Sequence, residues 1–308
     1  MERAIESRSK FNKYFRIFKK NLFLFWTIFP AVSYIGIFFI IIAFFLLKLS
    51  LTKFTGGQEV MVPTLSNYMN IINSAEFMDA LIRTFIFVLI TTPLQLVSGL
   101  LFAMLINRQF KGRGIIRSIF LLPLAIPTIV TTATLLLLFS KGGHATSLLM
   151  GEYSWFPQVL NKEISFINNE FTAIGISIFG KVWRDTPISM LILLAGLQSI
   201  DNDQYEAART MGSGSVKNFF YITLPLLVPA ISSVLVLRSI EAWKEFIFPY
   251  ILAPSFPVLG VLIEKYYVQL MDPGTAAVIG IILIVIILIG SVILNWLLEQ
   301  VRKYLVKV

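Results

Sequence analysis

Long apolar runs separated by polar segments dominate the pattern of the chain. An α-helix needs roughly 20 apolar residues to cross a hydrocarbon core about 30 Å thick. Six runs satisfy this length and predict transmembrane helices near residues 23–47, 81–106, 116–139, 174–199, 219–251 and 276–298. The pattern therefore predicts an all-α membrane protein, with a basic segment at 1–22, a six-helix transmembrane domain at 23–298 and a tail at 299–308.

The composition excludes an ordinary soluble enzyme. Of the 308 residues, 56% are hydrophobic and 14% are charged, whereas soluble domains carry about 25% charged residues. Cysteine is absent and His144 is the single histidine, which excludes thiol nucleophiles, disulfides, iron–sulfur clusters and zinc sites of the usual Cys and His type. We identify no catalytic residue and no metal ligand in the sequence.

Lysine and arginine are concentrated on alternate polar segments. Sixteen lie on the side of the N-terminal segment, namely Arg3, Arg8, Lys10, Lys13, Arg16, Lys19, Lys20, Arg108, Lys111, Arg113, Arg117, Arg209, Lys217, Arg302, Lys303 and Lys307. Five lie on the other side, namely Lys48, Lys53, Lys141, Lys162 and Lys265. The positive-inside rule then predicts that both termini are cytoplasmic. The net charge of +9 requires no nucleic acid, and the basic residues at 8–20 are either a topology signal or a lipid-binding segment.

The polar segment at 200–218 predicts a short helix followed by a sharp turn. Asp201 and Asp203 favour the N-terminus of a helix, where negative charge is stabilised, and two alanines follow with high helix propensity. Gly212 can adopt the left-handed conformation that ends a helix. These residues predict a helical elbow on the cytoplasmic face. The simpler alternative is a turn that joins two membrane helices.

The spacing of residues in and after this elbow is specific. Glu206 is followed by Ala207 and Ala208, Gly212 comes six residues after the glutamate, and Pro225 ends an Ile-x-Leu-Pro sequence. This pattern resembles the EAA motif of permease subunits of binding-protein-dependent ABC importers. The resemblance implies a type I importer permease in which these five residues belong to a coupling helix that docks onto an ATP-binding subunit. Physically, the alanines allow close approach and the glutamate can pair with an arginine of the partner.

Motifs elsewhere in the chain resemble the carbohydrate branch of this family. They are Leu-Thr-Lys-Phe at 51–54, Asn-Tyr at 67–68, Pro-Leu-Gln-Leu at 93–96, Arg108 with Lys-Gly-Arg-Gly at 111–114, Leu-Pro at 122–123, Ile-Pro at 126–127 and the segment at 191–200. That branch imports di- and oligosaccharides, polyols and glycerol phosphates. The resemblance implies four kinds of partner: a homologous second permease, two ATP-binding subunits, an extracytoplasmic solute-binding protein and the bilayer of a bacterial or archaeal cytoplasmic membrane.

The segment at 175–181 has the spacing of a phosphate-binding loop. Val182 occupies the place of the Ser or Thr that would ligate Mg²⁺, and no strand–loop–helix unit surrounds the segment. We therefore expect that the chain holds no cofactor and is a transport subunit rather than an enzyme. ATP and Mg²⁺ would be bound by the partner ATPase.

Charged residues inside the fourth and fifth runs are the candidates for the substrate pathway. Such charges cost several kcal/mol at membrane depth unless they pair or line water, so they form either a structural network or the wall of a water-filled pathway. Depth along the two helices predicts that Arg184 pairs with Glu241 or Glu245. Trp183 and Trp243 add flat faces that either stack on sugar rings or anchor the helices at the interface. The candidate pathway residues are Trp183, Arg184, Asp185, Arg238, Glu241, Trp243, Lys244 and Glu245, with Lys181 as a further buried charge.

Two sets of alternatives stay open at this point. Prolines interrupt the apolar runs at 123, 127, 187, 225 and 229, and they are either packing kinks or gating hinges. The function could also be that of an importer of the same architecture for amino acids, peptides or an anion, or that of an ion-coupled carrier or membrane enzyme. The sequence shows neither clear inverted repeats nor clustered catalytic groups.

Overall fold

The structure is a computed structural model that describes residues 2–153, 155–159 and 166–306 of the chain. Side chains are described from Trp26 onward, apart from Met61 and residues 304–306. The basic side chains predicted at 1–22, together with Lys162 and Lys307, lie outside this described part. Most of the described residues are helical.

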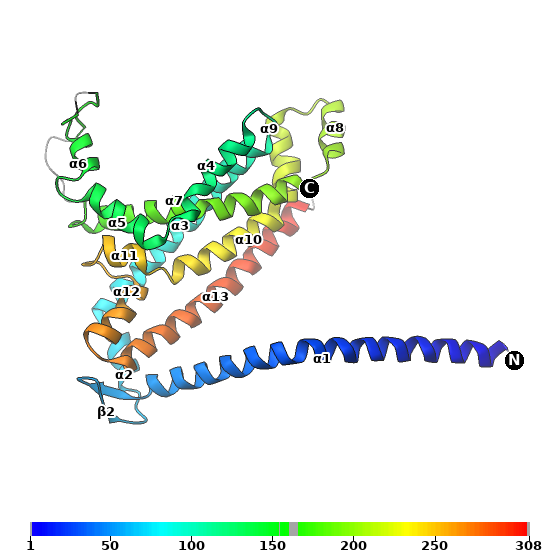
Figure 1. The fold of residues 1–308 in the computed structure, drawn as a ribbon, viewed down its shortest axis with the longest axis horizontal. Helices are drawn as coiled ribbons and strands as arrows, with labels where there is room; N and C mark the ends of the chain where they lie inside the picture. The colour runs from blue at the N-terminus through cyan, green and yellow to red at the C-terminus, as the bar shows by residue number, and fades with distance from the viewer. Residues whose placement is uncertain (1, 154, 160–165, 307–308) are drawn as a thin grey trace.

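The first helix stands apart from the rest of the molecule. Helix α1 (Glu2–Ser50) contacts α13 (Pro273–Val306) near one end and is splayed away from it elsewhere (Figure 1). It leads into an antiparallel hairpin of β1 (Lys53–Thr55) and β2 (Gln58–Met61), which is followed by α2 (Ser66–Ile72).

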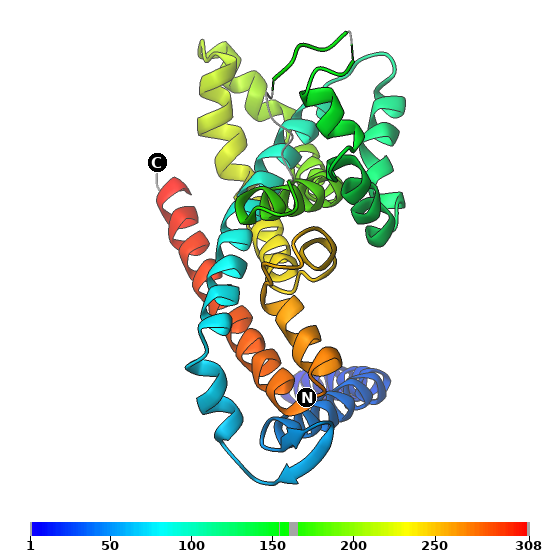
Figure 2. The ribbon, with the colours of Figure 1, turned by 90° about the vertical axis from the view of Figure 1, so that its left-hand side faces the viewer.

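Three long helices form the centre of the bundle (Figure 2). Helix α3 (Ala75–Asn107) packs extensively against α7 (Glu170–Gln198), and both contact α10 (Leu224–Trp243). Close approach of α3 to α7 depends on Gly99, because a Cβ atom there would lie 2.8 Å from Cβ of Ser189. Small residues at helix crossings are typical of membrane bundles, where packing drives association.

The third predicted helix is broken, so the prediction of one continuous helix at 116–139 was wrong. Helix α4 (Arg113–Ala125) and helix α5 (Thr128–Phe139) meet at 90°. The break falls at Ile126 and Pro127, because proline disfavours the helical conformation of the preceding residue and has no N–H to donate. Ile126 is accordingly extended, with φ −87° and ψ 127°. A short helix, α6 (His144–Leu149), follows.

The fifth predicted helix, at 219–251, is also discontinuous. Helix α9 (Ser215–Asn218) and the π-helical turn η1 (Phe219–Thr223) lead into α10, which ends at Trp243. A break at 244–246 then precedes α11 (Ile247–Leu252), so the predicted helix was wrong beyond Trp243. Helix α12 (Leu259–Glu264) and the turn η2 (Lys265–Gln269) connect α11 to α13.

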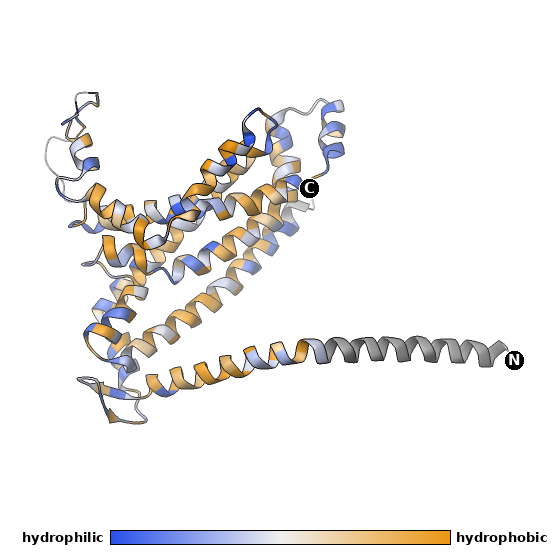
Figure 3. Ribbon diagram, viewed as in Figure 1, coloured by the Kyte–Doolittle hydropathy of each residue, from blue (hydrophilic) through white to orange (hydrophobic). Residues whose placement is uncertain are grey.

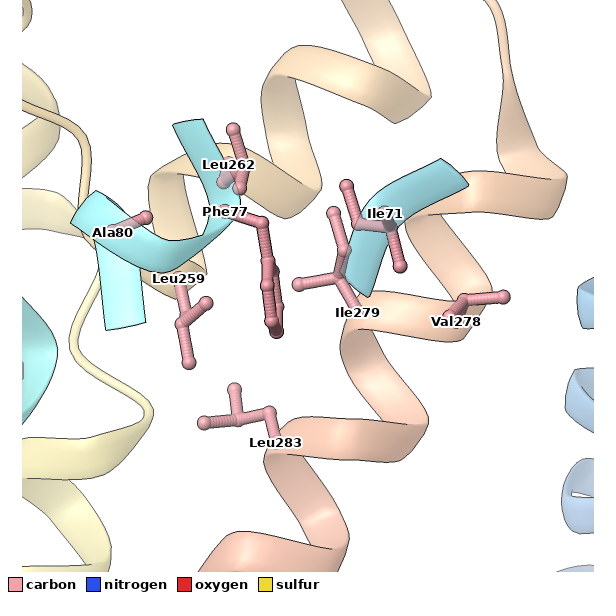
Figure 4. Packing of buried hydrophobic residues seen from close by; sticks show 8 residues of the cluster. All are labelled: Ile71, Phe77, Ala80, Leu259, Leu262, Val278, Ile279 and Leu283. Atoms are coloured by element: carbon pink, nitrogen blue, oxygen red, sulfur yellow. The ribbon is translucent and has the colours of Figure 1, made fainter. Parts of the chain in front are cut away.

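An apolar core closes the end of the bundle next to the β-hairpin. Figure 4 shows Phe77 of α3 surrounded by side chains from α2, α12 and α13. The buried members are Ile71, Phe77, Ala80, Leu259, Leu262, Val278, Ile279 and Leu283. Burying large apolar side chains contributes about 1.5–3 kcal/mol each, so this cluster fixes α12 and the start of α13 against α3.

Four helical segments of the described residues are long and apolar enough to cross a membrane, and a bent pair brings the number to five. The four are Trp26–Ser50, Ala75–Asn107, Ser215–Trp243 and Pro273–Lys303, and the bent pair is α4 with α5. Figure 3 shows apolar residues along these helices. Helix α7 is long enough but carries Glu170, Lys181, Arg184 and Asp185. The chain is therefore a largely helical, multi-pass membrane protein.

Candidate functional site

The elbow predicted at 200–218 contains the helix α8 (Asn202–Thr210). Asp201 caps its N-terminus, with Oδ1 accepting a hydrogen bond from the backbone N–H of Asp203 at 3.3 Å. Gly212 has a φ of +79°, the left-handed conformation that ends the helix. The local structure predicted for this segment is therefore confirmed.

Helix α8 lies at one end of the molecule (Figure 1), and none of its residues is buried. Glu206 and Ala207 are exposed, and Ala208 is half-buried. Pro225 lies at the start of α10, directly after the π-helical turn η1, so its missing N–H falls inside the helical segment Ser215–Trp243. The exposed helix with its unshielded carboxylate has the properties of a surface for a protein partner.

One contact of α8 was not anticipated from the sequence. The hydroxyl of Tyr205 lies 2.9 Å from Oγ1 of Thr223 in η1. The two residues are separated by 18 positions, and neither hydrophobic periodicity nor the motif itself indicates that they meet.

The second cluster of candidate residues is a chain of buried ion pairs. Nη1 of Arg184 lies 2.7 Å from Oδ1 of Asp185, and Oδ2 of the same carboxylate lies 2.9 Å from Nζ of Lys181. Nζ of Lys181 also lies 2.6 Å from Oε2 of Glu245, which follows the end of α10. The side chains of Lys181, Asp185 and Glu245 are 4%, 6% and 11% exposed. Charges of the fourth and fifth predicted helices therefore do meet.

The predicted partner of Arg184 was wrong. Arg184 pairs with its neighbour Asp185, and Lys181 is the cation that reaches Glu245. The predicted pairing requires a straight helix through residue 251, but α10 ends at Trp243 and Glu245 lies in the break at 244–246. Its position is instead determined by backbone N–H groups, because Oε1 accepts from Phe246 at 3.2 Å and from Phe248 at 3.4 Å. The carboxylate of Glu245 thus pairs with Lys181 and also caps the N-terminus of α11.

A second buried cation lies further along α10. Arg238 is 1% exposed, and its Nη1 lies 2.8 Å from Oε2 of Glu241. The contact is an ion pair without hydrogen-bond geometry, and Nε and Nη2 have no hydrogen-bond partner within the described residues. Glu241, whose side chain is 31% exposed, extends from this pair toward the surface.

Arg238 lies between two apolar clusters of the bundle. Val234, one turn before it, belongs to a cluster with Met190 and Leu193, while Ala242, one turn after it, belongs to another with Phe87. Buried polar residues occupy the intervening level of α3, α7 and α10, namely Thr91, Thr92, Gln95, Lys181, Asp185, Ser189 and Arg238. We call the six charged residues of this region the charge layer: Lys181, Arg184, Asp185, Arg238, Glu241 and Glu245. Its three cations and three anions balance.

The remaining pathway candidates are not brought together. Trp183 is 43% exposed and lines an apolar pocket of about 380 Å³ between α5 and α7. Trp243 packs in two other apolar clusters, with its ring 6.3 Å from that of Phe85. Lys244 is exposed at the end of α10. Trp243 is therefore half-buried against apolar clusters, whereas Trp183 is more exposed and faces the pocket.

The segment with phosphate-loop spacing is not a loop. Residues 175–181 lie within the continuous helix α7, and Lys181 is held by two carboxylates. Its ammonium group is therefore occupied by partners from the chain itself.

The sequence relationship decides the family. The family described as "Binding-protein-dependent transport system inner membrane component" matches residues 95–303, from the middle of α3 to the last turn of α13. This chain belongs to that family. The permease family was therefore predicted correctly from the EAA spacing, and the protein is a membrane component of a transport system.

Individual relatives of this permease cover most of its length. The trehalose/maltose transport system permease protein MalF of Thermococcus litoralis is 32% identical over 235 residues, which are 74% of this chain and 77% of the relative. The arabinooligosaccharides transport system permease protein AraP of Bacillus subtilis is 31% identical over 76% of this chain and 75% of the relative. The sulfoquinovosyl glycerol transport system permease protein SmoG of Agrobacterium fabrum is 30% identical, with 74% of each chain covered.

Solved structures confirm the fold. A crystal structure of a bacterial ABC transporter involved in alginate import superimposes with a TM-score of 0.76, at 20% identity, over 94% of this permease and 99% of that chain. The alginate transporter in complex with its pentasaccharide-bound periplasmic protein gives a TM-score of 0.77, at 19% identity, over 92% of this permease and 96% of that chain.

Proposed function

We propose that this chain is the permease subunit of an ATP-driven sugar importer and forms half of its translocation pathway. The observation that carries the substrate class is the set of relatives at 30–32% identity, which are named for transport of trehalose and maltose, arabino-oligosaccharides and sulfoquinovosyl glycerol. These substrates are sugars or glycosides. They favour a carbohydrate over the amino acids, peptides or anions that the same architecture could carry.

We propose that this permease has six membrane spans. Four are single helical segments and the bent pair of α4 and α5 is a fifth. Helix α7 is the sixth, since Lys181, Arg184 and Asp185 neutralise one another and Glu245 within the bundle. An unpaired charge at that depth costs several kcal/mol, and ion pairing offsets this cost.

The orientation follows from the position of α8. Helix α8 and the end of α13 lie at one end of the molecule, while the β-hairpin and α2 lie at the other (Figure 1). The basic turn between α3 and α4 belongs to the α8 end, as do the basic residues of α13. By the positive-inside rule, the α8 end of the molecule is cytoplasmic, and the two chain termini are cytoplasmic as well.

The partners follow from this orientation. α8 is the coupling helix, and it docks onto one of two ATP-binding subunits that hold ATP and Mg²⁺. Glu206, Ala207, Ala208, Gly212 and Pro225 shape and present this contact. An extracytoplasmic solute-binding protein delivers substrate at the opposite end, consistent with the periplasmic protein bound in the alginate transporter. A homologous second permease completes the pathway.

We assign different roles to the pathway candidates. Lys181, Asp185 and Glu245 hold α7 to the break before α11, because their charges are almost completely buried. Arg184, with a side chain 25% exposed, and the half-exposed Trp183 can reach a solute beside α7. An aromatic face with a neighbouring guanidinium suits a sugar, which offers both apolar ring faces and hydroxyl groups.

The test is reconstitution of this permease with its second permease, ATPase and binding protein in liposomes. Labelled trehalose, maltose and arabino-oligosaccharides are compared with an amino-acid and peptide panel, with and without ATP. We expect ATP-dependent uptake of at least one carbohydrate. Uptake confined to amino acids or peptides would overturn the substrate class, and uptake driven by an ion gradient without the ATPase would overturn the transporter class.

A further inference from the structure

Helix α8 is attached to the membrane bundle by few contacts. None of its nine residues, all of which the structure describes, is buried. The linker after it contains Gly212 and Gly214, and a Cβ atom added at either position would meet no atom within 4 Å. Glycine leaves the backbone of such an unpacked linker easily deformed. The covalent connection by itself is therefore a poor transmitter of a displacement from α8 to α10.

A side-chain hydrogen bond bypasses this linker. The hydroxyl groups of Tyr205 and Thr223 lie 2.9 Å apart, and Thr223 Oγ1 donates to the carbonyl oxygen of Asn218 at 3.4 Å. A hydroxyl can donate and accept, so either residue can donate in this contact, and when Thr223 donates to Asn218 the donor is Tyr205. In the part of the chain that the structure describes, no other hydrogen bond joins α8 to another helix.

The two residues occupy the positions where a mechanical link is most direct. Tyr205 immediately precedes Glu206, the exposed carboxylate of the docking surface. Thr223 is 7% exposed and immediately precedes Leu224, the first residue of α10. Helix α10 is continuous as far as Trp243 and contains Arg238 and Glu241 of the charge layer.

We propose that Tyr205 and Thr223 are positioning residues that couple α8 to α10, so that the displacement of α8 by the ATPase moves α10 rather than bending the glycine linker. This inference rests on the proposed role of α8 as the coupling helix. It assigns the transmission step to one hydroxyl–hydroxyl contact, distinct from the docking surface itself.

Four variants isolate this contact. Tyr205→Phe removes the tyrosine hydroxyl and keeps the ring, and Thr223→Val replaces the threonine hydroxyl with a methyl group of similar shape. Thr223→Ser retains a hydroxyl and serves as the conservative variant. Tyr221→Phe is the matched control, because Tyr221 lies in the same turn η1 with a side chain that is 66% exposed.

The experiment measures three quantities in the assembled complex: capture of the ATPase, rate of ATP hydrolysis and solute taken up per ATP. Tyr205→Phe and Thr223→Val should leave capture and hydrolysis within about twofold of wild type but lower uptake per ATP about fivefold, as expected for loss of one hydrogen bond. Thr223→Ser and Tyr221→Phe should transport normally. The Tyr205→Phe/Thr223→Val double variant should match the single variants, because both remove the same interaction.

Three outcomes contradict the inference. Wild-type uptake per ATP in Tyr205→Phe would show that the hydroxyl transmits nothing. Loss of ATPase capture in that variant would make Tyr205 part of the docking surface instead. Additive losses in the double variant would show that the two hydroxyls act separately. Failure of the proposed function is distinguishable, since Glu206→Ala would then capture the ATPase and transport as wild type.

Discussion

Helix α8 and the charge layer contain the same types of residue in opposite environments. α8 presents Glu206 to solvent, whereas the side chains of Lys181 and Asp185 are 4% and 6% exposed. Removing one partner of a buried ion pair costs about 3–5 kcal/mol, while an exposed pair contributes about 0–1 kcal/mol. The charge of Glu206 is therefore accessible to a partner, whereas Lys181, Asp185 and Glu245 hold parts of the bundle together.

This difference separates binding from stability. A substitution in α8 should weaken the attachment of the ATPase and leave the bundle folded. A substitution in the charge layer should destabilise the bundle before any effect on partners is visible.

The largest effect is expected from Lys181→Met. This change leaves Asp185 and Glu245 facing each other without their shared cation, and it should lower stability by about 3–5 kcal/mol. Unfolding in detergent, followed by fluorescence or by loss of monodisperse protein on heating, measures the change. Lys244→Met is the matched control, because Lys244 is exposed at the neighbouring helix end. Equal stability of the two variants would contradict the structural role of Lys181.

The identity of the ion-pair partner can be determined by double-mutant cycles. The cycle Lys181→Met with Glu245→Gln should give a coupling energy of about 1–3 kcal/mol, because the two side chains are in direct contact. The cycle Arg184→Met with Glu245→Gln should give a smaller coupling, because Arg184 is linked to Glu245 only through Asp185 and Lys181. A larger coupling energy for Arg184 with Glu245 than for Lys181 with Glu245 would instead support the pairing of Arg184 with Glu245 that was predicted from depth along the helices.

A smaller effect is expected where α8 ends. Gly212 has φ +79° and Gly214 has φ −81°, so Gly212→Ala should strain the backbone by about 1–2 kcal/mol and Gly214→Ala should not. Because α8 packs weakly against the bundle, we expect the strain to reduce ATPase capture rather than to unfold the permease. Pull-down of the ATPase with both variants measures this, and equal capture would show that the helix end is unimportant for docking.

The smallest effect on stability is expected from Glu206→Ala. The exposed carboxylate lies outside the core, so thermal stability should change by less than about 0.5 kcal/mol. Capture of the ATPase should nevertheless fall at least about tenfold, since charge-assisted contacts across an interface are worth 1.4 kcal/mol or more. Glu299→Ala is the control, because Glu299 is an exposed glutamate on α13. Undiminished capture by Glu206→Ala would dismiss the assignment of α8.

Local sequence was sufficient to predict the elements whose interactions are local. The helix cap at Asp201 and the left-handed Gly212 depend on residues within one turn of the chain. The apolar runs were also readable from the sequence, because the bilayer favours apolar residues along a membrane-spanning helix whatever that helix packs against. The EAA spacing identified the family for the same reason, because its residues lie within 20 consecutive positions of the chain.

The tertiary structure alone decided which residues meet across the bundle. Prolines marked possible interruptions, but only packing determined that α4 and α5 turn by 90° while α7 continues through Pro187. Glu245 reaches Lys181, 64 positions away, because the break after α10 reorients its carboxylate. Contacts of this kind depend on the relative placement of helices, and a periodicity of 3.6 residues specifies the face of a helix but not the neighbour that covers it.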